Sequence, residues 1–186
     1  MPPIDREQIL DRIHRFDELV DVLVEPLRTP ALDKIFYPLS SAADHSILWH
    51  VLGLTRALRV GNPAIARRLT QAMALESALT NGVIKSFFGR ERPEDDRAEV
   101  DEPLPYGMRR PITSAFPSGH ATAAFTAATL LGRGTRLAPA YYSLAALVSF
   151  SRVYTRMHHA SDVIGGAVLG LGFGQVIARV RPLERR

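Results

Sequence analysis

Three separated segments of the chain combine basic, hydroxyl and imidazole side chains that are suited to binding an oxyanion and transferring it. The first segment, 85–93, begins with one of only two lysines and ends in Arg-Pro. The second is the tetrapeptide Pro-Ser-Gly-His at 117–120. The third, 151–162, begins with Ser-Arg and contains a histidine four residues before an aspartate. Each segment alone has an ordinary explanation, because such residues also cap helices and form surface pairs.

The combined charges of these segments suit a phosphoryl group. Lys85, Arg92 and Arg152 supply three cations. Ser118 and the amide of Gly119 lie where a helix is expected to begin, and a helix N-terminus is a ready anion site. Arginine binds two phosphate oxygens at once, whereas lysine adds a point charge. Because phosphoryl transfer spreads charge over three oxygens in its transition state, a pocket of this kind would stabilise it.

The spacing of His158 and Asp162 allows one side chain to orient the other. Asp162 is the single acidic residue between Glu102 and Glu184. At the start of an apolar helix it favours the helix dipole, and one turn from His158 it can also accept a hydrogen bond from a ring nitrogen. The second ring nitrogen then keeps its lone pair for attack, so both roles are compatible.

The hydrophobic pattern predicts an all-α chain without strand alternation or repeats. Residues 5–28 form an amphipathic pattern, which predicts a helix that either packs on the domain or lies on a membrane. Further helices are expected at 39–60, 63–88, 119–131, 137–151 and 160–179, with a long polar loop at 89–117. Because the chain leaves His120 along one helix and returns along the next, the three segments are expected at one end of the bundle.

Length and composition exclude several classes of protein. With 186 residues the chain has the size of one domain. The absence of cysteine excludes disulfide scaffolds, thiolate metal sites and cysteine nucleophiles. A net charge of +4, carried by scattered basic residues, is too mild to predict a nucleic-acid partner. The first ten residues lack the basic-then-apolar pattern of a signal peptide.

Together the three segments resemble the signature of the type 2 phosphatidic acid phosphatases, which are related to bacterial acid phosphatases and vanadium haloperoxidases. That signature is Lys, six residues, Arg-Pro; then Pro-Ser-Gly-His; then Ser-Arg, five residues, His, three residues, Asp. The chain matches every part in order between residues 85 and 162. The resemblance implies an all-α fold, a compact bundle of about five to six helices. We expect an N-terminal amphipathic helix and linker at 1–36 and a helical phosphatase domain at 37–186.

The resemblance also implies residue roles. His158 would attack phosphorus and form a phosphohistidine, and Asp162 would orient it. His120 would protonate the leaving oxygen and then act as a base on water. The phosphate would be held by Lys85, Arg92, Ser118, Gly119 and Arg152. No metal or other cofactor is expected, because the cations and amides supply the electrostatic stabilisation.

Small residues crowd the expected helices at 119–131 and 160–179, as in helices that pack closely inside membranes. We therefore expect a multi-pass protein of the cell membrane, in which Asp44 and Glu76 face inward. Arginines gather at the end of the bundle away from the site, so the positive-inside rule predicts an extracytoplasmic site. The arginines expected at that end are Arg56, Arg59, Arg67, Arg68, Arg133, Arg136, Arg179, Arg181, Arg185 and Arg186.

The leading hypothesis is a phosphohydrolase acting on a lipid phosphate or a polyprenyl mono- or diphosphate. Three alternatives stay open: a soluble acid phosphatase of broad specificity, a non-enzymatic scaffold that binds anionic lipids, and a vanadium-dependent haloperoxidase. The sequence leaves the lipid, the preference for mono- or diphosphate, the number of spans, the oligomeric state and the pathway undetermined.

Overall fold

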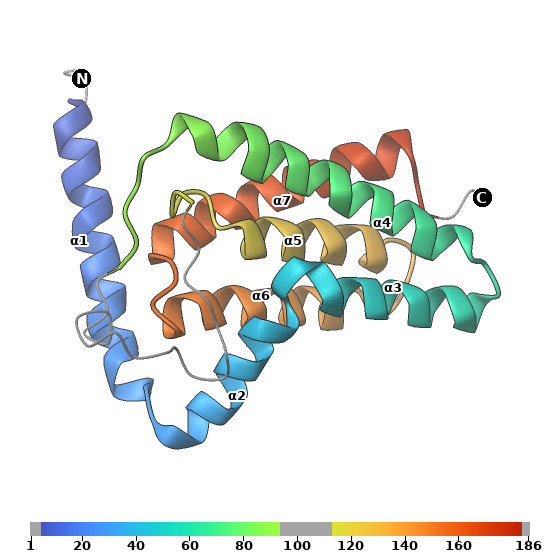
Figure 1. Ribbon diagram of the computed structural model, residues 1–186, viewed down its shortest axis with the longest axis horizontal. Helices are drawn as coiled ribbons and strands as arrows, with labels where there is room; N and C mark the ends of the chain where they lie inside the picture. Colours follow the sequence, from blue (N-terminus) through green and yellow to red (C-terminus); the bar gives the residue numbers. More distant parts are fainter. Residues whose placement is uncertain (1–4, 94–112, 184–186) are drawn as a thin grey trace.

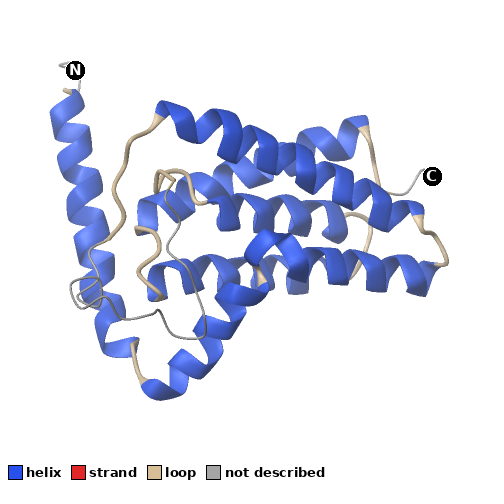
Figure 2. Cartoon of the chain, viewed as in Figure 1, coloured by secondary structure: helices blue, strands red, loops and turns tan. Residues whose placement is uncertain are grey.

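The computed structural model describes residues 5–93 and 113–183, and all regular structure in these ranges is helical (Figures 1 and 2). Within these ranges there are seven α-helices: α1 (Arg6–Val24), α2 (Pro30–Ala42), α3 (Ile47–Val60), α4 (Ala64–Ser77), α5 (Gly119–Gly132), α6 (Ala138–Tyr154) and α7 (Ala160–Val180). Short 3₁₀ segments are η1 (Glu25–Leu27), η2 (Asp44–Ser46) and η4 (Ile84–Phe87), and the π-helical η3 (Ala78–Val83) continues α4. The predicted all-α class is confirmed.

The helix count exceeds the expected five to six because α2 begins at Pro30, in a stretch expected to be a linker, and the helix predicted at 39–60 divides at η2. The backbone turns at η2, where His45 (φ 51°) and Ser46 (φ 61°) adopt the left-handed region that non-glycine residues seldom occupy. Pro30 is the first residue of α2. Its fixed φ suits a first helical position, and the Thr29 side chain caps this end by accepting a hydrogen bond from the Leu32 amide.

Helix α5 forms the centre of the bundle and packs closely on α7. Ten of the fourteen residues of α5 are buried, most of them alanine or threonine. On α7, a Cβ added at Gly166 would lie 2.5 Å from the Ser118 carbonyl oxygen, and one at Gly174 would lie 2.5 Å from Thr129. Glycines on this face therefore let the two backbones approach, as the small-residue pattern indicated. This contact fixes the start of α5 beside the start of α7.

Helix α1 crosses one end of the bundle instead of joining it lengthwise (Figure 1). Its inner face buries Asp17 and Val24, and Val24 packs with Tyr37, Tyr154 and Met157 in a small second core. Between the two sequence-based alternatives for this helix, the structure therefore shows packing on the domain, while Leu19, Val22 and Leu23 remain exposed. The expected domain division after residue 36 stays a prediction.

Helix α7 is long and apolar enough to cross a membrane, and among the described residues it is the one helix that is. Its 21 residues span about 32 Å, close to the thickness of a bilayer core. Only 22% of its most apolar stretch is buried, unlike the core helix of a soluble protein. Glu76, which interrupts the apolar pattern of α4, is 1% exposed and accepts a hydrogen bond from Thr80 (2.9 Å), so it faces inward as expected.

Candidate active site

A cavity of about 560 Å³ opens where α5 begins and α6 ends. All three chemistry-bearing segments reach its wall. The expected site residues that line it are Lys85, Arg92, Gly119, His120, Arg152 and His158. The other two, Ser118 and Asp162, are fully buried behind the wall. Residues that lie far apart in the sequence thus meet at one end of the bundle.

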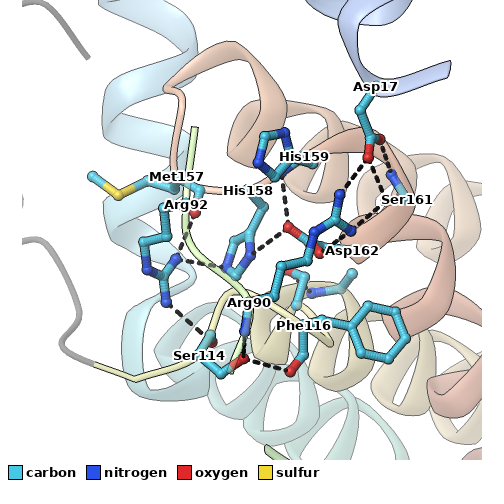
Figure 3. Close-up of polar contacts among 12 residues, drawn as sticks. Asp17, Arg90, Arg92, Ser114, Phe116, Met157, His158, His159, Ser161 and Asp162 are labelled. Atoms are coloured by element: carbon cyan, nitrogen blue, oxygen red, sulfur yellow. Dashed lines mark hydrogen bonds and ion pairs between the residues drawn. The ribbon is translucent and has the colours of Figure 1, made fainter. Parts of the chain in front are cut away.

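His158 lies in the short connection between α6 and α7, and the backbone there holds it in place. The amides of Met157 and His158 both donate to the carbonyl oxygen of Arg152 (3.0 and 3.2 Å). The ring is 2% exposed, and its Nε2 lies 3.2 Å from Nη1 of Arg92 (Figure 3). Because guanidinium can only donate, Nε2 carries the lone pair and the proton belongs on Nδ1.

Asp162 lies behind the ring, on the first turn of α7. Its Oδ2 is 3.7 Å from His158 Nδ1, which is longer than a hydrogen bond, and accepts from the His159 amide at 2.9 Å (Figure 3). Its Oδ1 accepts from Nη1 of Arg90 at 2.8 Å. Asp162 therefore caps α7 and also faces the proton-bearing nitrogen of His158, although the two side chains form no hydrogen bond at this distance.

Burial, followed by the cations of Arg152, Arg92 and Lys85, holds the pKa of His158 well below its usual value. The ring is consequently neutral at physiological pH, which is the form that can attack. Burial, with the charges of Arg92 and Arg152, also lowers the pKa of Lys85 to about 8. The site thus concentrates positive charge in a poorly solvated space.

The three cations are held from different parts of the chain. Arg92 donates to the carbonyl oxygens of Met157 (2.5 Å) and Thr113 (3.1 Å). Lys85 Nζ donates to Thr113 Oγ1 at 3.4 Å, and Arg152 Nη1 donates to Ser40 Oγ at 2.5 Å. Nε of Arg152 is buried and has no partner among the described residues. An arriving phosphate would satisfy such donors.

Ser118 and Gly119 play different parts at the start of α5. The Ser118 hydroxyl accepts from the Ala121 amide (3.5 Å), and its own amide donates to the Asp162 carbonyl oxygen (3.0 Å). Gly119 reaches the cavity wall, where an added Cβ would lie 3.1 Å from the Asn81 side chain. Of the pair, Gly119 is therefore the one placed to offer its amide to an anion.

Sequence reasoning missed two residues of the site. Asp44 Oδ1 lies 2.7 Å from His120 Nε2, whereas the sequence predicted only that Asp44 faces inward. Arg90 binds Asp162, although it stands between the spaced positions of its motif. No spacing rule joins either residue to its partner, because Asp44 and His120 are 76 positions apart and Arg90 and Asp162 are 72 apart.

The bundle thus ends in a buried histidine and a buried aspartate beside the cationic side chains of Lys85, Arg92 and Arg152. The profile described as the PAP2 superfamily matches residues 66–186, and the chain belongs to that superfamily. The resemblance stated from the motifs is confirmed. The protein is a phosphatase of this superfamily, and its α7 is long and apolar enough to cross a membrane.

Named relatives carry the comparison further. The chain is 30% identical over 142 residues to decaprenylphosphoryl-5-phosphoribose phosphatase of Mycobacterium tuberculosis, and the aligned region covers 76% of each protein. It is 35% identical over 112 residues to lipid A 1-phosphatase of Porphyromonas gingivalis, which covers 55% of this chain and 22% of that protein.

Two solved structures share the fold. One is a transmembrane PAP2 type phosphatidylglycerolphosphate phosphatase from Bacillus subtilis, with a TM-score of 0.69 and 21% identity over 91% of this chain and 86% of that one. The other is LpxE from Aquifex aeolicus, with a TM-score of 0.66 and 27% identity over 86% of this chain and 93% of that one.

Proposed function

We propose that the protein removes phosphate from a membrane lipid phosphate through a phosphohistidine on His158, without a metal ion. The observation that carries this proposal is the position of the His158 Nε2 lone pair beside Arg92 on the wall of a cationic cavity, with Asp162 behind the ring. A neutral imidazole whose free lone pair faces the substrate and whose other nitrogen faces a carboxylate is suited to act as a nucleophile.

In the first step, the phosphate lies among Lys85, Arg92 and Arg152, and Nε2 attacks phosphorus in line with the leaving oxygen. A P–N bond forms as the P–O bond breaks, and protonated His120 gives its proton to the leaving oxygen. His158 gains a positive charge, which Asp162 stabilises. In the second step, His120 takes a proton from water, the resulting hydroxide attacks phosphorus, and the P–N bond breaks to release phosphate and neutral His158.

In this cycle, cationic side chains and a backbone amide stabilise the charge on the transferring phosphoryl group. Three cations face the transferring group, and the amide of Gly119 points from a helix N-terminus. A phosphoryl group needs little covalent chemistry beyond its nucleophile and its acid, so positioning and charge suffice for catalysis.

The cavity wall next to the cations favours a substrate with a polar group beside its phosphate. Asp44, Ser46, Ser77 and Asn81 line this part, and they offer hydrogen-bonding groups instead of apolar contact. Such a wall suits hydroxyl groups on the leaving side. The name of the 30% identical relative, decaprenylphosphoryl-5-phosphoribose phosphatase, supports a lipid-linked sugar phosphate as the first candidate.

We further propose that the chain crosses the membrane several times with the cavity outside the cytoplasm. Apolar side chains are exposed around the bundle on α3, α6 and α7, including Val51, Leu54, Leu58, Leu147, Ile164, Val168 and Val176. The end opposite the cavity carries the arginines counted from the sequence, apart from Arg185 and Arg186, which lie outside the described residues. In membrane proteins, the helix ends and loops that are rich in Lys and Arg stay on the cytoplasmic side.

A phosphate-release assay tests the proposed function directly. The purified protein is offered phosphatidic acid, phosphatidylglycerol phosphate, a polyprenyl diphosphate, a polyprenyl-linked sugar phosphate and a soluble aryl phosphate. Turnover of a lipid substrate that is lost in His158→Ala supports the proposal. Turnover that survives in His158→Ala excludes the nucleophile, and turnover restricted to the aryl phosphate favours the soluble acid phosphatase.

A further inference from the structure

Arg90 joins α1 to the aspartate behind the proposed nucleophile. Its Nη1 donates to Asp162 Oδ1 at 2.8 Å and to Ser161 Oγ at 2.6 Å, and its Nη2 pairs with Asp17 Oδ2 at 2.5 Å (Figure 3). The two carboxylates therefore share one guanidinium. One of them belongs to the site, and the other comes from a helix 145 positions away in the sequence.

Asp17 is buried and fully hydrogen-bonded, although it lies on the amphipathic α1. Its side chain is 3% exposed. Oδ1 accepts from the Ser161 amide (2.8 Å), and Oδ2 accepts from the Ser161 hydroxyl (2.7 Å). Burying a carboxylate is costly unless it is paired and hydrogen-bonded, and here every contact is made with the catalytic end of α7 or with Arg90.

The segment after α1 braces the other side of the same loop. Arg28 donates to the carbonyl oxygens of Tyr154 (3.0 Å) and Val153 (3.3 Å), and Glu25 pairs with Arg156. His158 thus lies in a stretch of chain that the N-terminal segment holds at both ends. That segment precedes residues 66–186, which match the superfamily.

We propose that Asp17 and Arg90 are positioning residues, which act through Asp162 to set the orientation and charge environment of His158. This rests on the proposed function, because it requires His158 to be the nucleophile. Asp17, Arg90, Asp162 and the His158 cation formed during attack alternate in sign along a continuous path. Asp17 balances Arg90, so that Asp162 keeps enough negative charge to stabilise the imidazolium.

The alternation of charges predicts how removal of the Asp17 charge changes the activity of His158. Without the Asp17 charge, Arg90 is less compensated and the potential at Asp162 and His158 becomes more positive. His158 then holds a proton less tightly and is a weaker nucleophile. The maximal rate falls, and the acidic limb of its pH profile, where neutral His158 is required, moves to lower pH. Binding of the ground-state phosphate by Lys85, Arg92 and Arg152 changes little.

The test compares Asp17→Asn with Glu18→Gln, using phosphate release from the best lipid substrate of the panel in detergent micelles. Glu18 is the exposed neighbour of Asp17 on α1 and serves as the matched control. We expect Asp17→Asn to lower kcat by about ten-fold or more, with KM changed by less than about two-fold, and to shift the acidic limb downward. Glu18→Gln is expected to match the wild type in all three quantities.

A second pair of variants checks that the two residues act in series. Arg90→Lys keeps the charge but lacks the fork that spans both carboxylates, so it is expected to lose kcat as Asp17→Asn does. Adding Asp17→Asn to Arg90→Gln is expected to cost little more than Arg90→Gln alone. Arg90→Lys also provides the test if Asp17→Asn does not accumulate as folded protein.

The failures can be told apart. If His158→Ala retains turnover, the proposed function and the positioning role fall together. If His158→Ala is inactive but Asp17→Asn and Arg90→Lys keep wild-type kcat, the positioning role alone is wrong. A variant with a lower melting temperature but an unshifted pH profile shows that Asp17 only stabilises the fold, and this outcome also overturns the proposal.

Discussion

Asp44 Oδ1 and His120 Nε2 lie 2.7 Å apart at the cavity wall. Burial raises the pKa of Asp44, but its hydrogen bond to His120 and the charges of His120 and Arg152 outweigh this and leave the pKa below its usual value. Asp44 is therefore ionised, and its carboxylate favours the protonated form of the imidazole. It opposes burial and the charge of Arg152, which together lower the pKa of His120 to about 4. An acid that must deliver a proton to a leaving oxygen requires the protonated form.

This pair predicts a dependence on the leaving group. Asp44→Asn is expected to lower kcat by about a hundred-fold on alkyl phosphates, whose leaving oxygen needs a proton. On para-nitrophenyl phosphate, whose leaving group departs without one, the loss is expected to be small. The measurement is the ratio of kcat on the two substrates, with His120→Ala for comparison. An equal loss on both substrates would show that Asp44 stabilises the fold or the shape of the cavity and does not assist the acid.

The nucleophile and its aspartate are expected to respond differently to substitution. His158→Ala is expected to abolish turnover, because it removes the ring nitrogen that would form the bond to phosphorus. Asp162→Asn keeps the shape of the side chain but removes the charge that stabilises the imidazolium, so a loss of about a hundred-fold or more is expected. Circular dichroism checks that both variants fold. Wild-type rates in folded Asp162→Asn would contradict the role given to Asp162.

The lowered pKa of Lys85 predicts weaker phosphate binding in alkaline solution. As the pH rises through about 8, Lys85 loses its proton and the cavity loses one cation. Competitive inhibition by inorganic phosphate should therefore weaken between about pH 7 and about pH 9.5. Lys85→Arg stays charged over this range, so its inhibition constant should be nearly constant. A parallel pH dependence in both proteins would assign the titration to another group.

Catalysis by side chains alone predicts indifference to chelators. Prolonged dialysis against EDTA, followed by assay in metal-free buffer, is expected to leave kcat unchanged, because the cations that face the phosphate are covalent parts of the chain. Activity lost on dialysis and restored by a divalent ion would overturn the metal-independent mechanism. A magnesium-dependent phosphatase, treated in parallel, confirms that the dialysis removes metal.

The proposed orientation predicts unequal labelling of two introduced cysteines. The chain has no cysteine of its own, so Ser86→Cys near the cavity and Thr135→Cys at the arginine-rich end can be labelled individually. In intact cells an impermeant maleimide should modify position 86 and spare position 135, and both should react after permeabilisation. Equal labelling before permeabilisation would refute the orientation.

The sequence predicted correctly those helices whose ends and packing faces depend on residues close together in the chain. The pairing of glycines at 166 and 174 with α5 follows from small residues on one face of a helix, and the ends of α5 and α7 lie within one or two residues of their predicted positions. The break at 43–46 was not predicted. Its signal is the polar triplet Asp-His-Ser, in which His45 and Ser46 adopt the left-handed backbone next to Asp44, the partner of His120.

Thus the sequence alone determined the helical class, the three segments that reach the site and the spacing of His158 and Asp162, because each depends on short-range periodicity or fixed offsets along the chain. Only the tertiary structure decided which of these groups face the cavity, that Asp44 partners His120, and that Asp17 and Arg90 lie behind Asp162. Those contacts join residues more than seventy positions apart, and their geometry depends on how helices cross, which no local pattern encodes.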